Sequence, residues 1–210
     1  MTDHRIDPWR LEIIVVRGRS HTDGERSALR RDQARGRLRR VGHGAYVERA
    51  AFDGLSPEEQ HVVRMRAITA LSDRPVVFSH WSAAVLHGLP VLWARLMTVH
   101  VTVARTAARS RAGVTGHVFG LQESEIVMFR GLLFTSAERA VVDIAGAAPF
   151  EEGVMAADGL LLADVPRHLL EAAVDLAGPR RAGPRTGKAV SFAHPGAESA
   201  AESRFRVSAM

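Results

Sequence analysis

Apolar and polar residues near the start of the chain follow two different spacings. Leu11 to Val16 is a short β-branched run, which is typical of a strand. Residues 25–35 contain no proline and no interior glycine, and good helix formers dominate among them. This stretch is therefore predicted to be a helix, and Gly36 supplies the residue at which such a helix usually ends.

The spacing changes directly after Gly36. Arg37 to Val41 and Ala45 to Glu48 predict two short strands. The residues between them, Gly42-His43-Gly44, tolerate a positive φ and predict a tight turn. We therefore expect a hairpin here, followed by a connector at residues 50–55.

The rest of the chain alternates between helical and strand patterns. Ser56, Pro57 and Glu59 form a strong helix start with a capping box. Ser79 is expected to cap a short helix in the same way, and Arg139 is expected to pair with Asp143 four residues later. Helices are predicted at residues 57–72, 80–87, 137–148, 150–162, 166–177 and 198–210, and strands at 76–78, 97–103, 114–119, 125–129 and 132–134.

Composition and charge narrow the class of protein. The 210 residues are 46% apolar, which is enough for a packed core, and the net charge is +5. Lys188 is the only lysine, so the positive charge is carried by arginine. This balance favours a polyanionic partner, although a bias toward GC-rich codons explains the same composition. Without cysteine, disulfides and thiolate metal sites are excluded, and without a signal or membrane segment a cytoplasmic location is expected.

Arginine is concentrated in the predicted helix and hairpin. Four arginines fall on one half of the helical wheel, and three more follow in the first hairpin strand: Arg26, Arg30, Arg31, Arg35, Arg37, Arg39 and Arg40. A helix has the width of the DNA major groove, and a basic hairpin can neutralise phosphates. A solvated, arginine-rich surface helix accounts for the same residues, as does a basic interaction module with no role in nucleic-acid binding.

Residues for metal or nucleophilic chemistry do not form a recognised pattern. His80 and His87 share a helix face, and His100 and His117 lie on neighbouring predicted strands. No carboxylate recurs at metal-ligand spacing beside either pair, so neither a metal site nor a cofactor is predicted. No Gly-x-Ser-x-Gly or phosphate-binding glycine loop is present. Glu202 is a lone carboxylate, and we expect it to pair with Arg206.

Several blocks of sequence carry a family resemblance. They are Gly36-Arg37-Leu38-Arg39-Arg40-Val41 with Gly42-His43-Gly44-Ala45-Tyr46-Val47, the Phe78-to-Pro90 block with its Ser-His-x-Ser-Ala-Ala-x-Leu-His-Gly-Leu-Pro core, Phe134 to Asp143, and Ala156-Ala157-Asp158. Together these blocks resemble the AbiEi-family antitoxins of actinobacteria, whose front part is a winged helix-turn-helix.

The resemblance implies binding of double-stranded DNA, often as a repressor of the protein's own type IV toxin–antitoxin operon, with no need for direct contact with the toxin. The implied DNA-binding residues are the seven arginines named above, together with His43 and Tyr46. The chain is expected not to be an enzyme. Its larger domain is the candidate surface for a homodimer, and no membrane association is expected.

The tail resembles the opening of a very-short-patch-repair-like endonuclease domain. Residues 197–206 carry this likeness, with Glu202 at the position of the first acidic residue. The strands that would complete a magnesium site do not follow, so this chain is not expected to cut DNA. The alternative function is therefore the targeting half of such an endonuclease, and the chain has the appearance of the front part of a longer protein.

These observations predict an α+β fold: a small winged helix-turn-helix followed by a mixed α/β domain with a mainly helical C-terminal half. A helix-turn-helix has a helix before its recognition helix. Here residues 11–20 are short and β-branched instead, so the first domain is predicted to be abbreviated. The predicted domains are residues 1–50 and 56–177, then a Gly/Pro-rich basic linker at 178–197 and the endonuclease-like start at 198–210.

Overall fold

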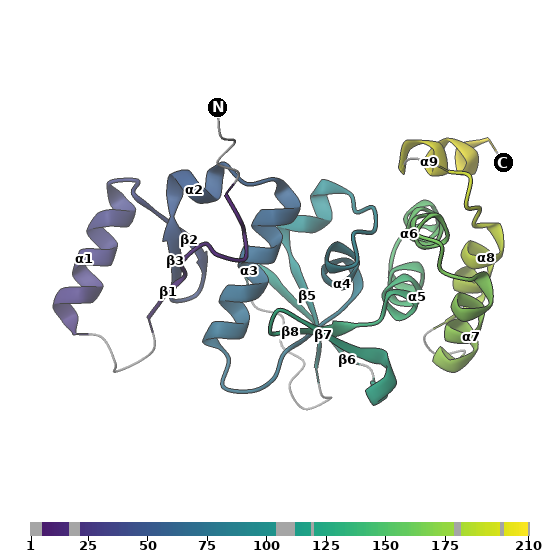
Figure 1. Ribbon diagram of the computed structural model, residues 1–210, viewed down its shortest axis with the longest axis horizontal. Helices are drawn as coiled ribbons and strands as arrows, with labels where there is room; N and C mark the ends of the chain where they lie inside the picture. The colour runs from purple at the N-terminus through teal and green to yellow at the C-terminus, as the bar shows by residue number, and fades with distance from the viewer. Residues whose placement is uncertain are drawn as a thin grey trace. The chain divides into compact units, whose positions relative to one another are not determined.

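The chain folds into two units, each built of helices and a small sheet (Figure 1). The structure, a computed structural model, describes residues 6–16, 22–103, 112–118, 120–178, 182–197 and 200–209. Backbone contacts place the boundary between the two compact units at Val76 and Val77. The predicted α+β class is confirmed. No helix in the described ranges has both the length and the apolar character needed to cross a membrane.

A three-stranded antiparallel sheet organises the first unit. Its strands are β1 (Ile14–Val15), β2 (Leu38–Gly42) and β3 (Ala45–Glu48), in the order β1-β3-β2. The predicted hairpin is thus confirmed, with an irregular register between Arg40 and Gly42. Gly44 in the turn has a φ of +83°, and a Cβ there would lie 2.8 Å from the carbonyl oxygen of Val16. Only glycine therefore fits where the turn approaches the end of β1.

The predicted basic helix is α1 (Asp23–Ala34). It begins with a capping box, in which Thr22 Oγ1 accepts from the Glu25 backbone NH and Glu25 accepts from the Thr22 NH. Gly36 follows its C-terminus with a φ of +73°. Among the described residues α1 is the only helix before β2, so no second helix precedes the hairpin there. No residue of α1 is buried.

Two further helices complete the first unit. The predicted connector is wrong, because residues 49–53 form α2 (Arg49–Asp53), which Glu48 caps by accepting from the Ala50 and Ala51 backbone NH groups. α3 (Pro57–Leu71) begins with the predicted Ser56–Glu59 capping box. It packs against β1 and β2, so the first unit extends past residue 50. The core consists of Val47, Phe52, Leu55 and Val63, with Ile6, Leu11, Ile13 and Val41 against it.

A five-stranded mixed sheet lies in the second unit, and its strands match the predicted ones. In spatial order they are β6 (Val114–Val118), β5 (Val99–Val103), β4 (Val77–Phe78), β8 (Leu132–Thr135) and β7 (Ile126–Phe129). β5 pairs with β6 in parallel, as does β4 with β8, and the other two pairs are antiparallel. Short 3-10 turns, η2 (Trp93–Met97) and η4 (Glu123–Glu125), precede β5 and β7.

Helices supply most of the second unit's core. They are α4 (His80–Leu86), α5 (Ala137–Ala147), α6 (Phe150–Leu162), α7 (Arg167–Ala177), α8 (Pro184–Phe192) and α9 (Ala200–Ser208). α6 is apolar on most of its surface, because α5, α8 and α9 all pack against it (Figure 1). Its residues and those of α4 and α5 dominate the largest cluster of buried side chains.

The predicted linker and tail are parts of this second unit. Residues 184–192 form α8, in which Ala189 and Val190 are buried, so residues 178–197 as a whole are not a linker. α9 also packs on α6, and Val207 lies against the small buried cluster that contains Ala189. Arg206 donates to the buried carboxylate of Asp158 at 2.6 Å, where the sequence had suggested Glu202 as its partner. The tail is therefore attached to the same core as α6.

A buried ionic network joins the start of β7 to α5. The Arg139 side chain is almost fully buried and donates to Glu125 Oε1 at 2.6 Å and to Asp143 Oδ1 at 2.9 Å. The predicted Arg139–Asp143 pair is thus confirmed. The third member, Glu125, follows from the tertiary fold, because it approaches α5 from η4. Each charge in this network depends on its partners, since burying an unpaired charge is costly.

Replacing Arg139 with alanine should therefore destabilise the second unit severely. Two carboxylates would remain without their cation, and such a loss costs about 3–5 kcal/mol in the free energy of unfolding. Urea denaturation followed by circular dichroism measures this change. Arg185→Ala, which removes an exposed arginine from α8, should change the free energy by less than about 0.5 kcal/mol. Equal effects from the two substitutions would contradict the structural role of Arg139.

Candidate nucleic-acid interface

All nine residues predicted to bind DNA lie in the first unit. Three arginines are on α1 and two are on β2, with Arg35 at the C-terminal cap of α1 and Arg37 between the two elements; His43 is in the turn, and Tyr46 is on β3. The continuous path from helix to hairpin brings them into one region because Gly36 turns the chain immediately after α1. The structure therefore gathers the residues that the sequence proposed.

The four helix arginines form two rows. Arg26 and Arg30, one turn apart, face the hairpin and line a cleft between it and α1. Arg31 and Arg35, also one turn apart, are exposed on a different side of the helix. Arg30, Arg31 and Arg35 have no carboxylate partner within the described part of the chain. The single stripe expected from the helical wheel is thus divided between a cleft row and an outer row.

The hairpin arginines already have partners. Arg37 lies 3.4 Å from Asp32, and Arg39 lies 3.9 Å from Asp53, which also binds Arg49. These side chains are exposed, so each ion pair contributes little to stability and can be exchanged for a phosphate at small cost. Asp32 and Asp53 therefore hold the guanidinium groups of Arg37 and Arg39 at the surface of the hairpin.

Arg40 is oriented by the turn itself. Its Nε donates to the carbonyl oxygen of Gly42 at 3.1 Å, and its Nη2 lies 2.9 Å from His43 Nδ1. A guanidinium only donates, so His43 Nδ1 is the acceptor and Nε2 carries the hydrogen. Arg40 and His43 consequently present hydrogen-bond donors at the end of the hairpin.

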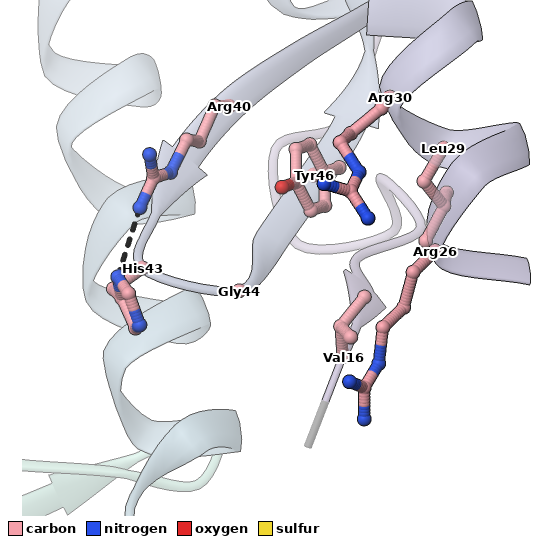
Figure 2. A pocket seen from close by; sticks show the side chains of 8 residues that line it. All are labelled: Val16, Arg26, Leu29, Arg30, Arg40, His43, Gly44 and Tyr46. Atoms are coloured by element: carbon pink, nitrogen blue, oxygen red, sulfur yellow. Dashed lines mark hydrogen bonds between the residues drawn. The ribbon is translucent and has the colours of Figure 1, made fainter. Parts of the chain in front are cut away.

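The cleft between α1 and the hairpin has a volume of about 430 Å³. Figure 2 shows Arg26, Leu29 and Arg30 reaching from α1 on one side of the cleft. Arg40 and His43 bind each other on the other side, and Tyr46 lies between the two walls. The described residues that line it are Val16, Arg26, Leu29, Arg30, Arg40, His43, Gly44 and Tyr46, and none of these eight carries a carboxylate.

α3 adds one cation to this region that was not predicted to bind DNA. Arg64 is partly buried, with its guanidinium carbon 5.4 Å from the centre of the Phe52 ring. Burial lowers the pKa of Arg64, and the nearby charge of Arg39 lowers it further. The sequence placed Arg64 at the edge of α3, and its spacing gave no indication that it would come near the hairpin.

Three histidines of the second unit, the buried His80 and His100 and the half-buried His117, form a cluster. His100 and His117 lie on neighbouring strands as predicted, with His100 Nδ1 2.9 Å from His117 Nε2. The His117 ring also stacks on that of His80 at 3.5 Å between ring centres. His87 is directed elsewhere, with its Nε2 2.9 Å from the Thr135 carbonyl oxygen. Within the described ranges, no three His, Asp or Glu side chains are arranged to hold a metal ion.

Ser79 differs from its predicted role. It occupies the position before α4, but its side chain makes no capping hydrogen bond. Its Oγ lies 3.0 Å from His80 Nδ1 instead. His80 itself has a φ of +52°, a strained value for a residue with a side chain. The packing of the histidine rings therefore takes precedence over helix capping here.

No family model matches the chain, and no curated protein matches it.

The histidine cluster predicts a pH dependence of stability. Burial lowers the pKa of His117. Below the ordinary value of about 6.5, the unfolded chain therefore binds a proton that the folded chain resists. The free energy of unfolding should fall as the pH drops from about 7.5 to about 5.5. Urea titrations at several pH values measure this slope.

His117→Gln serves as the test variant, because glutamine offers a polar group without titrating in this range. The slope should become shallower in the variant, because the group whose pKa burial lowers is removed. An unchanged slope would show that His117 is not responsible.

Proposed function

We propose that the chain binds double-stranded DNA through α1 and the β2–β3 hairpin, and that it acts as a transcriptional regulator of the antitoxin type. The observation that carries this proposal is the outer row of α1. Arg31 and Arg35 are exposed, have no carboxylate partner in the described part of the chain and lie on a helix that buries none of its side chains. The positive charges of Arg31 and Arg35 therefore face solvent and do not contribute to the packing of the core.

The dimensions of these elements suit DNA. α1 has 12 residues and is about 18 Å long, and an α-helix fits the width of the major groove. The hairpin follows directly, so its arginines can contact phosphates beside the groove that the helix enters. Arginine favours this use, since its fork of donors matches phosphate oxygens and the edge of guanine.

The stability of α1 points in the same direction. A helix of this length is marginal in water by itself. α1 has a capping box at one end, the Gly36 turn with the Arg37–Asp32 contact at the other, and contacts with β2. A nucleic-acid surface would add contacts along its exposed side.

The narrower function rests on sequence resemblance. The blocks similar to AbiEi antitoxins favour a repressor of the protein's own operon, with the second unit as scaffold and as the candidate surface of a homodimer. In this proposal the protein works in the cytoplasm, performs no catalysis and does not require direct contact with a toxin. Glu202 is exposed on α9, whose packing on α6 favours a structural role for the tail.

Substituting the outer row, Arg31→Ala with Arg35→Ala, should weaken DNA binding and its dependence on salt. Each lost phosphate contact lowers the slope of log Kobs against log salt concentration by about 0.9, so we expect a decrease of about 1.8. Fluorescence anisotropy with a labelled duplex of about 30 base pairs, at several salt concentrations, measures the slope.

The matched control is Arg185→Ala with Arg204→Ala, which removes the same charge from exposed positions of the second unit. This control should leave the slope close to that of the unmodified chain. An unchanged slope in the α1 variant, or an equal decrease in the control, would contradict the assignment of the interface to α1.

An operon repressor should also prefer its own upstream DNA. At one salt concentration, a duplex from the region before the protein's own gene should bind at least about 10³-fold more tightly than a scrambled duplex of the same composition. Competition between the two duplexes measures this ratio. Equal affinities for the two duplexes would be consistent with DNA binding but would contradict autorepression.

A further inference from the structure

β7 forms one edge of the five-stranded sheet in the second unit. It pairs with β8 on one side, and no other described strand pairs with it on the other side. Alternate residues of an antiparallel strand direct their NH and carbonyl groups away from the paired strand, so β7 has hydrogen-bonding groups available for a further strand. Proteins often protect such an edge with a bulge, a proline or a lysine. β7 contains none of these features, because its regular register with β8 covers Ile126-Val127-Met128-Phe129.

The last two side chains of β7 are apolar and exposed. The exposed fraction is 72% for Met128 and 50% for Phe129. Successive residues of a strand point to opposite faces of the sheet, so these two side chains make the edge apolar on both faces. An edge strand with exposed apolar side chains is a surface on which another strand can pair.

The two ends of β7 carry opposite charges. Glu123 precedes the strand in η4 and is exposed, whereas its neighbour Glu125 is buried and bound to Arg139. Arg130 follows the strand in the hairpin turn, with its guanidinium carbon 5.4 Å from the centre of the Phe129 ring. The edge therefore has an acidic start and a basic end, and two such strands that run in opposite directions are complementary in charge.

We propose that β7 of one copy pairs in antiparallel with β7 of a second copy, which joins the two sheets edge to edge about a two-fold axis. In a pairing centred on Val127, Arg130 of each copy lies opposite Ser124 of the other and one residue from its Glu123. A two-fold interface makes every such contact twice. The charges at the two ends therefore favour a second copy of this chain as the occupant of the edge.

This inference rests on the homodimer named in the proposed function, and it assigns that homodimer a surface. A two-fold dimer carries two copies of the first unit, as a repressor that reads two half-sites requires. An edge of four residues makes a small interface, so we expect reversible association in the micromolar range.

Sedimentation velocity of the full chain without DNA, at about 1 to about 300 µM, measures this association. We expect monomers at the lowest concentrations and dimers at the highest. Met128→Lys should raise the dissociation constant of the dimer at least about tenfold, because it places a charge in the apolar part of the pairing. The matched control is Met97→Lys, since Met97 is also exposed, at 59%, and lies in η2 before β5, which β4 and β8 separate from β7. This control should change the constant by less than about twofold.

Charge reversal tests the antiparallel arrangement. Glu123→Arg alone and Arg130→Glu alone each place like charges together in a dimer of identical copies, so each should weaken association. An equimolar mixture of the two single variants restores opposite charges at both ends, so dimers should form as readily as in the unmodified chain. Both positions are exposed, and thermal melting followed by circular dichroism checks that each variant is folded.

Three results would overturn the pairing of β7. They are a monomer at every concentration, which would leave the edge to a strand of another protein, equal weakening by the two lysine variants, and a mixture of the charge variants that associates no better than either alone. The DNA slope depends on Arg31 and Arg35 of the first unit, and this experiment contains no DNA. A dimer without the predicted slope would contradict DNA binding alone, and the predicted slope without a dimer would contradict the β7 pairing alone.

Discussion

The proposed interface depends on a helix, α1, that carries three arginines and a fourth at its C-terminal cap, and that has no fully buried residue. α1 is held by its capping box and by the Gly36 turn, while the core of the first unit is built from β3, α2 and α3. Mutual repulsion among the arginines is not relieved by carboxylates at Arg30, Arg31 or Arg35 within the described residues. In the proposed function, the phosphates of DNA relieve this repulsion at the exposed arginines Arg31 and Arg35.

In the second unit, in contrast, arginines form ion pairs with buried carboxylates. There Arg139 is enclosed by Glu125 and Asp143, and Arg206 reaches the buried carboxylate of Asp158. These pairs connect η4 to α5 and α9 to α6, so they position elements within the core. Net charge alone therefore does not distinguish these arginines: burial and carboxylate partners separate Arg139 and Arg206 from the exposed Arg31 and Arg35.

Local signals predicted much of the fold. The capping box at Ser56, the turn at Gly42 to Gly44 and the i,i+4 pair of Arg139 all act over a few residues, and the structure contains each of them. Elements that depend on tertiary contacts were missed. α2 uses Glu48 as its cap, and α8 lies within a segment whose glycines and prolines indicated a linker. The Ser79 hydroxyl lies beside the His80 ring instead of capping α4. His80 stacks on His117, which is distant in the sequence, so local spacing could not predict these surroundings.

For the proposed interface, the sequence placed the arginines in one helix and hairpin but did not indicate two separate rows. A helical wheel placed the α1 arginines on one half of the helix, whereas the cleft and outer rows emerge only when the hairpin is in position. Hydrogen exchange of the α1 amides, with and without a saturating DNA duplex, tests the central claim most directly. The account predicts fast exchange in the free chain and marked protection of α1 and the hairpin on DNA binding. DNA binding with unchanged exchange in α1 would contradict it.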